Sequence, residues 1–257
     1  MKASEDVPPQ LVDIKITEKL NTKIDLNLTF VDESGRTVAL SEYFNKGRPV
    51  VFNLVYYGCP MLCGLVLKGV TNGLKQIPGN PGIDFEVITI SIDPKETSSL
   101  AAAKKDAVLT DYGRPNAGTG WHFLIGQEAN IKAIADQVGF GYRYDEKQQQ
   151  YAHAAVTMLL TSDARISRYL YGLEYQPRDL RLGLTEAAEG KYGSTIDKFL
   201  LFCFHYDAKA GSYVFFATNV MKAGGVLTIL ILAFVLVNLW RQDRDRVGRT
   251  KEGLTRA

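Results

Sequence analysis

Residues 49–64 read PVVFNLVYYGCPMLCG, an apolar run that passes directly into a pair of cysteines. The run Pro49–Tyr57 is rich in β-branched and aromatic residues, which is typical of a buried strand. Residues Met61–Gln76 have helical periodicity, and Pro78 and Gly79 would end that helix. The stretch therefore predicts a buried strand followed at once by a helix, with the cysteines at the junction.

The same alternation continues along the chain. A second buried strand is predicted at Phe85–Ile92, and a hairpin around Ser162-Asp163 at Ala155–Thr161 and Arg165–Tyr171. Further helices are predicted at Lys95–Tyr112, at Gln127–Val138 and from Gln176 to about Glu189. Strands that alternate with helices predict an α/β fold, with a mixed sheet that carries helices on both faces.

The cysteine pair is the most informative motif. Pro60 suits the first position of a helix, so Cys59 is expected at the helix N-terminus, where the helix dipole and unpaired amides stabilise a thiolate. Cys63 follows one turn later on the same face. Two thiolates in this arrangement can bind one soft metal ion, or the two cysteines can form a disulfide. Both chemistries are open for this pair.

A metal site needs a further ligand, because two cysteines alone do not complete the usual coordination. His153 is the candidate, since a loop before a late strand of such a sheet can lie beside the first strand-to-helix turn. Two sulfurs and one imidazole suit copper in both of its oxidation states. The alternative for His153 is an ordinary loop histidine with a hydrogen-bonded ring.

Three other residues have weaker claims. Cys203 and His205 suggest a second site, but Ser194–Asp197 resembles a capped helix start, and residues two apart on a helix do not face each other. A structural role is therefore favoured for both, unless the segment is a strand, in which they would share a face. His122 is expected to be a strand residue with a hydrogen-bonded ring.

The C-terminal part predicts a membrane anchor. Residues 223–240 read AGGVLTILILAFVLVNLW, without a charged residue, and as a helix they would span roughly 27 Å, close to the hydrocarbon thickness of a bilayer. A buried core helix is the alternative. The basic tail at 241–257 should be cytoplasmic by the positive-inside rule, so the preceding domain should lie on the periplasmic side of the inner membrane.

An exported domain requires a leader, yet residues 1–10 (MKASEDVPPQ) contain no apolar signal region. Either a leader was removed or is not included in this sequence, which we favour, or the topology is inverted. The predicted organisation is an N-terminal extension (1–19), a folded domain (20–215), a linker (216–222), a single transmembrane helix (223–240) and the tail (241–257).

A hydrophobic content of 46% excludes a disordered chain, and a net charge of +2 argues against a nucleic-acid partner. Three cysteines are too few for a disulfide scaffold.

Three motifs in order carry a resemblance to a known family. YYGCPMLC after an apolar strand, SIDP at Ser91–Pro94 after the next strand, and a late histidine before another strand resemble the Sco/SenC family. The resemblance covers roughly Leu20 to Glu189. It implies a thioredoxin-like fold and a membrane-anchored copper protein that helps to assemble the dinuclear copper centre of cytochrome c oxidase. It also implies copper ligation by Cys59, Cys63 and His153, with Asp93 as a supporting residue.

The sequence departs from the common family pattern at the motif and at the anchor. The family often has an acidic residue inside the cysteine motif, a proline after it and an aspartate before the histidine; this chain has Met61, Leu62, Gly64 and Ala152. The predicted anchor is C-terminal, whereas most members have an N-terminal one. The chain is similar to a divergent branch with CPMLC-type motifs and a C-terminal span. The missing carboxylates bear on metal affinity and on the choice of client.

Three functions follow from these features. The leading hypothesis is a copper metallochaperone that serves the copper-bearing subunit of a respiratory oxidase. The second is a thiol–disulfide oxidoreductase that keeps client cysteines reduced, with Cys59 as the attacking thiolate and Cys63 as the resolving thiol. The third is an accessory subunit of a respiratory membrane complex.

Overall fold

The computed structural model describes residues 14–58, 62–146 and 149–192, together with the helical residues Gly225, Thr228, Leu230, Leu232 and Ala233. Contacts along the chain divide it into two units, Met1–Gly193 and Ser194–Ala257. The predicted domain boundary at 19/20 lies within the described residues, those at 215/216, 222/223 and 240/241 lie outside them, and all four stay predictions.

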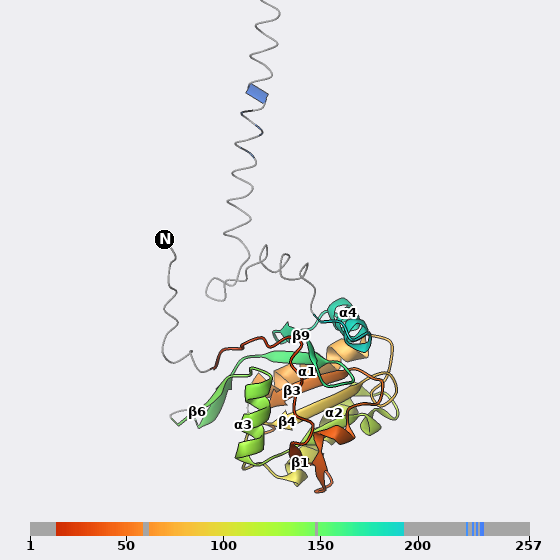
Figure 1. Ribbon diagram of the computed structural model, residues 1–257, viewed down its shortest axis with the longest axis vertical. Helices are drawn as coiled ribbons and strands as arrows, with labels where there is room; N and C mark the ends of the chain where they lie inside the picture. Colours follow the sequence, from red (N-terminus) through yellow and green to blue (C-terminus); the bar gives the residue numbers. More distant parts are fainter. Residues whose placement is uncertain are drawn as a thin grey trace, which may run out of the picture. The chain divides into compact units, whose positions relative to one another are not determined.

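A five-stranded sheet in the order β5-β4-β3-β8-β9 forms the centre of the first unit (Figure 1). β3 (Val50–Val55) pairs in parallel with β4 (Glu86–Ser91), which pairs in parallel with β5 (Trp121–Leu124). β8 (Val156–Leu160) runs antiparallel to both β3 and β9 (Ile166–Tyr171). Every residue of β3, β4 and β8 is buried. Strands that are covered on both faces favour apolar side chains, which explains the predominantly apolar runs of the sequence.

Helices cover both faces of this sheet. α1 (Leu62–Lys75) contacts both α2 (Ser98–Tyr112) and α4 (Pro177–Ala188), so these three helices form one layer. α3 (Glu128–Gln137) lies on the other side of the strands (Figure 1). The predicted mixed sheet with flanking helices is confirmed, and the predicted elements are found within a few residues of their expected ends.

α1 is held against the segment before α4 by two glycines. A Cβ atom at Gly69 would lie 2.1 Å from the carbonyl oxygen of Leu173, and one at Gly73 would lie 2.3 Å from Cδ1 of Leu180. Any larger residue would push the helix away from its neighbours. The two glycines thus fix the position of the helix whose first turn carries Cys63.

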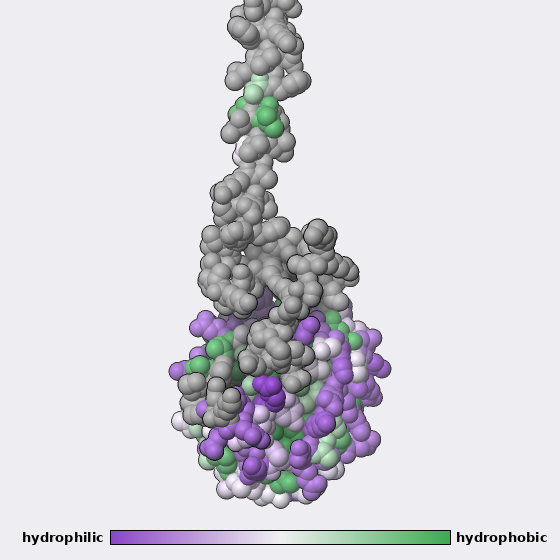
Figure 2. All heavy atoms as spheres, turned by 90° about the vertical axis from the view of Figure 1, so that its left-hand side faces the viewer, coloured by the Kyte–Doolittle hydropathy of each residue, from purple (hydrophilic) through white to green (hydrophobic). Residues whose placement is uncertain are grey.

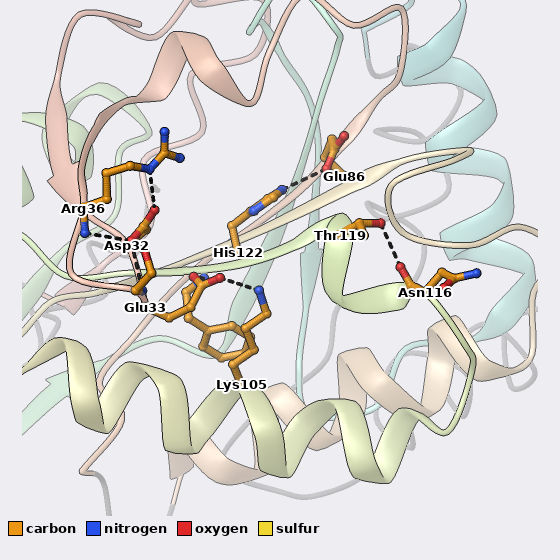
Figure 3. A network of polar contacts seen from close by, with 10 residues as sticks. Asp32, Glu33, Arg36, Glu86, Lys105, Asn116, Thr119 and His122 are labelled. Carbon is orange, nitrogen blue, oxygen red and sulfur yellow. Dashed lines mark hydrogen bonds and ion pairs between the residues drawn. The ribbon is translucent and has the colours of Figure 1, made fainter.

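Two short hairpins were not expected from the sequence. β1 (Thr29–Val31) pairs with β2 (Thr37–Ala39), and β6 (Tyr142–Asp145) pairs with β7 (Gln150–His153). The first hairpin turns around Asp32, whose Oδ1 accepts hydrogen bonds from the backbone amides of Ser34 and Arg36 (Figure 3). Strands of three or four residues give too few positions for an alternating pattern to be recognised. The second hairpin corrects one expectation, because His153 ends a strand rather than lying in a loop.

The described part of the first unit also contains the short 3₁₀ helices η2 (Leu40–Glu42) and η3 (Ala117–Thr119). On the face seen in Figure 2, hydrophilic residues predominate, and hydrophobic residues form only small, separate areas.

Within the described part of the chain, no helix is both long and apolar enough to cross a membrane. The expected span at 223–240 lies outside the described residues, apart from the five helical residues named above. The transmembrane helix therefore stays a prediction, as do the cytoplasmic tail and the leader.

Candidate metal and thiol site

The candidate site forms where several strands of the central sheet end at one edge. β3 and β4 are parallel, so the turn after Val55 and the loop after Ser91 emerge side by side. β8 is antiparallel to β3, with Asn53 opposite Thr157, so its preceding residues return to the same edge. Continuing that register brings the chain at Ala154 beside Tyr56. Topology alone therefore brings the segment around His153 to the turn that leads into the cysteine motif.

Ring contacts show how close that approach is. The imidazole of His153 has its centroid 6.4 Å from that of Tyr56, at an interplanar angle of 76°, and 5.5 Å from that of Phe140. Tyr56 lies three positions before Cys59 in the chain. The expected return of His153 to the first strand-to-helix turn is thus observed for the described part of that turn.

The hydrogen bonding of His153 selects one tautomer. Nδ1 lies 2.9 Å from the carbonyl oxygen of Ala154. A carbonyl oxygen can only accept, so Nδ1 carries the proton and Nε2 is the nitrogen with the lone pair. Burial lowers the pKa of His153, an effect that the hydrogen bond to Ala154 partly opposes. The imidazole is therefore neutral at physiological pH, which is the form that binds a metal ion.

Tyrosines line the hairpin beside His153. The ring of Tyr151 packs edge-on against Tyr56 at 5.5 Å and against Tyr144 at 5.0 Å. Burial, followed by the negative charge of Asp93, raises the pKa of Tyr151 to about 12. Asp93, the predicted supporting residue, is thus close enough to the histidine-bearing hairpin to act on it electrostatically.

Asp93 also shapes its own loop. Its Oδ1 accepts a hydrogen bond from the Lys95 amide at 2.9 Å, and its carbonyl oxygen accepts one from the Glu96 amide at 3.3 Å. Its own amide donates to the Ser91 hydroxyl at 3.1 Å. These bonds give the segment after β4 a fixed turn, which directs the next acidic residue back toward β3.

That residue is Glu96, which the sequence analysis did not single out. Its Oε2 accepts a hydrogen bond from the Tyr57 amide at 2.9 Å, and its Oε1 accepts one from the Gly58 amide at 2.6 Å. The Ser91 hydroxyl donates to Oε2 as well. Tyr57 and Gly58 form the turn that directly precedes Cys59, which we call the cysteine turn. A carboxylate from the neighbouring loop therefore binds the backbone of this turn. An acidic residue shortly after a strand that ends at the same edge was the available signal.

The side chain of Tyr57 fixes the same turn from the opposite direction. Its hydroxyl lies 2.8 Å from the Leu124 carbonyl oxygen and 2.9 Å from that of Thr89, and its single proton serves these two acceptors. The ring packs against Phe123 with centroids 5.7 Å apart. Burial, with a smaller contribution from the charge of Glu96, raises the pKa of Tyr57 well above its usual range. The turn is therefore anchored in the sheet.

The cysteines are only partly described. Cys59 lies outside the described residues, and Cys63 lies in the first turn of α1, as expected. Among the residues that the structure describes, no three His, Cys, Asp or Glu side chains gather as a metal site. Ligation by Cys59, Cys63 and His153 therefore stays a prediction. The possible second site at Cys203 and His205 also lies outside the described residues.

His122 lies at the opposite end of the sheet. It is in β5, and its Nε2 lies 3.0 Å from Oε2 of the buried Glu86 (Figure 3). Oε1 of the same carboxylate forms ion pairs with Arg48 at 2.5 Å and with Lys46 at 3.8 Å. The expectation of a strand histidine with a hydrogen-bonded ring is confirmed.

Comparison with known proteins identifies relatives of the whole first unit. The family model described as SCO1/SenC matches residues 17–188. An Aquifex aeolicus VF5 protein assigned to electron transfer is 25% identical, with a TM-score of 0.58, over 67% of this chain and 96% of its own. No curated protein sequence matches significantly.

Two further solved structures share the fold. BsSco, a member of the Sco family of cytochrome c oxidase assembly proteins, is 21% identical over 68% of this chain and 98% of its own, with a TM-score of 0.52. Copper-bound Arabidopsis thaliana ScoI is 18% identical over 67% of this chain and 99% of its own, with a TM-score of 0.50. The expected thioredoxin-like arrangement of sheet and flanking helices is confirmed by these likenesses.

Proposed function

This chain belongs to the SCO1/SenC family, and from that premise we propose that it is a copper metallochaperone of a respiratory cytochrome c oxidase. Copper is its cargo, bound by Cys59, Cys63 and His153. Relatives support the class of function, since BsSco belongs to a family of cytochrome c oxidase assembly proteins and the Arabidopsis thaliana ScoI structure contains copper.

The observation that carries the proposal is the position and state of His153. Its ring lies beside Tyr56, at the start of the turn that leads to Cys59, and the hydrogen bond to Ala154 leaves the lone pair on Nε2. Thiolates favour Cu(I), and an imidazole nitrogen helps to hold Cu(II). The bond to Ala154 also orients the ring, as outer hydrogen bonds do for metal-binding histidines.

The test is the copper stoichiometry of the protein, loaded anaerobically with Cu(I). The wild type should bind one equivalent, and the variants Cys59→Ala, Cys63→Ala and His153→Ala should bind it weakly or not at all. His122→Ala is the matched control, because that ring is bound to Glu86 at the other end of the sheet. One equivalent bound equally tightly by all three site variants would overturn the ligand assignment.

Oxidation of the loaded protein supplies a second readout. Sulfur-to-Cu(II) charge-transfer bands should be present in the wild type and in His122→Ala. They should be lost or displaced when either cysteine or His153 is replaced. A spectrum unchanged by His153→Ala would remove the imidazole from the proposed ligand set.

The thioredoxin-like fold, with Cys63 in the first turn of α1, also favours a second candidate function. In this alternative the pair acts as a thiol–disulfide oxidoreductase that keeps client cysteines reduced, with Cys59 attacking and Cys63 resolving. Activity that is lost in Cys63→Ser but unaffected by His153→Ala would favour this function over copper delivery.

The place of action is the periplasmic face of the inner membrane. The apolar segment 223–240 would anchor the chain, and the basic tail 241–257 would lie in the cytoplasm, in keeping with a CPMLC-type branch that has a C-terminal anchor. Such an anchor would keep the site close to the copper-bearing subunit of the oxidase. Protease added to intact spheroplasts should remove the folded domain, and protection of that domain would reverse the topology.

A further inference from the structure

Glu96 joins the loop after β4 to the backbone of the cysteine turn. We propose that Glu96 is a positioning residue that fixes this turn for metal binding and that its negative charge favours Cu(II) over Cu(I). This inference deepens the proposed copper function and rests on it. It is carried by the hydrogen bonds, the space at Gly58 and the charges around the carboxylate.

The hydrogen bonds define the turn. The two carboxylate oxygens of Glu96 accept from two consecutive backbone amides, those of Tyr57 and Gly58, at 2.9 Å and 2.6 Å. The Ser91 hydroxyl, at the end of β4, donates to the same carboxylate. A planar group that holds two successive amides fixes the orientation of both peptide planes. Cys59 follows them in the sequence, so Glu96 fixes the two peptide groups that lead into the cysteine motif.

The space at Gly58 agrees with this role. A Cβ atom at residue 58 would lie only 3.2 Å from Oε1 of Glu96. That separation is tighter than an ordinary van der Waals contact, so a side chain here would displace the carboxylate or the turn. Glycine thus permits the close approach that the two amide bonds require.

The charge of Glu96 is not cancelled locally. Within residues 14–58, 62–146 and 149–192, no Lys, Arg or His forms an ion pair with this carboxylate, and its described donors are two amides and a hydroxyl. Two thiolates and a neutral imidazole give a complex of charge −1 with Cu(I) and of charge zero with Cu(II). A nearby negative charge therefore opposes the Cu(I) complex more than the Cu(II) complex.

Glu96→Gln is the first test, because it keeps the size of the side chain but removes the charge. A glutamine carbonyl can accept from one amide only, and its NH₂ group would face the other amide, which is also a donor. In the copper-free protein, hydrogen exchange at the amides of Tyr57 and Gly58 should become about tenfold faster, in line with the loss of hydrogen bonds to a charged acceptor. In the loaded protein, the ratio of Cu(II) to Cu(I) affinity should fall roughly tenfold, the size expected for one partly solvated charge.

Glu96→Asp tests the length of the side chain separately from its charge. It keeps the charge, but a side chain shorter by one methylene cannot span from Ser91 to both amides. It should lose amide protection while keeping a copper affinity ratio close to that of the wild type. Asp106→Asn is the matched control, since it removes a negative charge from the exposed side of α2, and it should change neither readout.

The outcomes distinguish this inference from the function on which it rests. If wild-type protein binds no copper, the copper function fails, while amide exchange in the copper-free protein still decides the positioning role. Wild-type exchange rates at Tyr57 and Gly58 in Glu96→Gln would overturn the positioning role. An unchanged affinity ratio in that variant would overturn the effect of charge.

Discussion

A histidine and a carboxylate lie near each end of the central sheet, and their arrangements at the two ends are opposite. At the end where β4 begins, Glu86 is buried and pairs with His122 (Figure 3), and it also pairs with Arg48 and Lys46. At the end where β4 finishes, the carboxylate of Glu96 is bound by backbone amides and a hydroxyl, and His153 is bound by a carbonyl oxygen among aromatic rings.

This difference indicates that Glu86 and His122 stabilise the fold, whereas Glu96 and His153 serve metal binding. A buried carboxylate with cationic partners is compensated where it stands, and removing it takes the counter-charge away from those partners. Within the described residues the carboxylate of Glu96 has no cationic partner, and the neutral imidazole of His153 is the form that binds a metal ion. We therefore expect replacements at the first end to change stability, and replacements at the second end to change copper binding.

The largest effect is expected for Glu86→Ala. It would leave Arg48 and Lys46 without their buried counter-charge and should lower the free energy of unfolding by about 3–5 kcal/mol. Urea denaturation measures this change. The control is Glu42→Gln, which breaks an exposed ion pair with Arg36 and should cost less than about 1 kcal/mol. Equal destabilisation by the two variants would contradict the contrast between the ends.

The two histidines should also differ, with His122 affecting stability and His153 affecting copper binding. His122→Ala removes a donor from the buried Glu86 and should lower the free energy of unfolding by about 1.5–3 kcal/mol, with copper binding unchanged. His153→Ala removes a ring whose Nδ1 donates to a neutral carbonyl oxygen rather than to a buried carboxylate, so it should cost less stability, although it should abolish tight copper binding. The pair of denaturation curves decides this, and a larger loss of stability in His153→Ala would break the comparison.

Tyr57, at the end of the sheet where β4 finishes, should have a smaller effect on the free energy of unfolding, and this effect should depend on pH. Its pKa is raised in the folded state by burial, so the folded protein holds this proton more tightly than the unfolded chain does. The sign follows from linkage: its contribution to stability is complete below pH 10, the unfolded pKa, and is lost as the pH rises above that value.

Tyr57→Phe should therefore lower stability by about 1 kcal/mol at neutral pH, because Leu124 and Thr89 lose a donor. It should also reduce the decline in stability between pH 10 and pH 11. Denaturation curves at both pH values test this. An alkaline decline as steep as that of the wild type would remove Tyr57 as its source.

The smallest effect is expected at Asp163, in the turn between β8 and β9. Hydrogen bonding from the Thr161 hydroxyl, together with Arg165, lowers the pKa of this carboxyl despite some burial. A lowered pKa adds stability above pH 3.8, the unfolded value, and this stability is lost as the pH falls through the folded pKa. Asp163→Asn should cost less than about 1 kcal/mol at pH 7, because the side chain is half exposed, and the difference from the wild type should shrink as the pH falls below 3.8.

The sequence predicts those elements best in which burial is complete. β3, β4 and β8 were predicted because both faces need apolar side chains, and the long helices because their period and end signals agree. The β1–β2 and β6–β7 hairpins were missed, since three or four residues of mixed polarity carry no clear period. For that reason His153 was expected in a loop.

The candidate site could likewise be predicted only in part from the sequence. The approach of His153 to the first turn could be predicted, because it follows from the order of strands and the antiparallel return of β8. The role of Glu96 could not be predicted, because it depends on one side chain that reaches across from a neighbouring loop to two amides. Neither hydrophobic periodicity nor a motif records a contact of that kind.

The antiparallel pairing of β3 with β8 also constrains biogenesis. β3 is central in the sheet, yet one of its two hydrogen-bonding partners is made only after α1, β4, α2, β5, α3 and the β6–β7 hairpin. Until β8 emerges, one edge of this predominantly apolar strand stays open to other chains. A nascent chain therefore passes through an aggregation-prone stage in which both motif cysteines already exist but the distant histidine has not been translated.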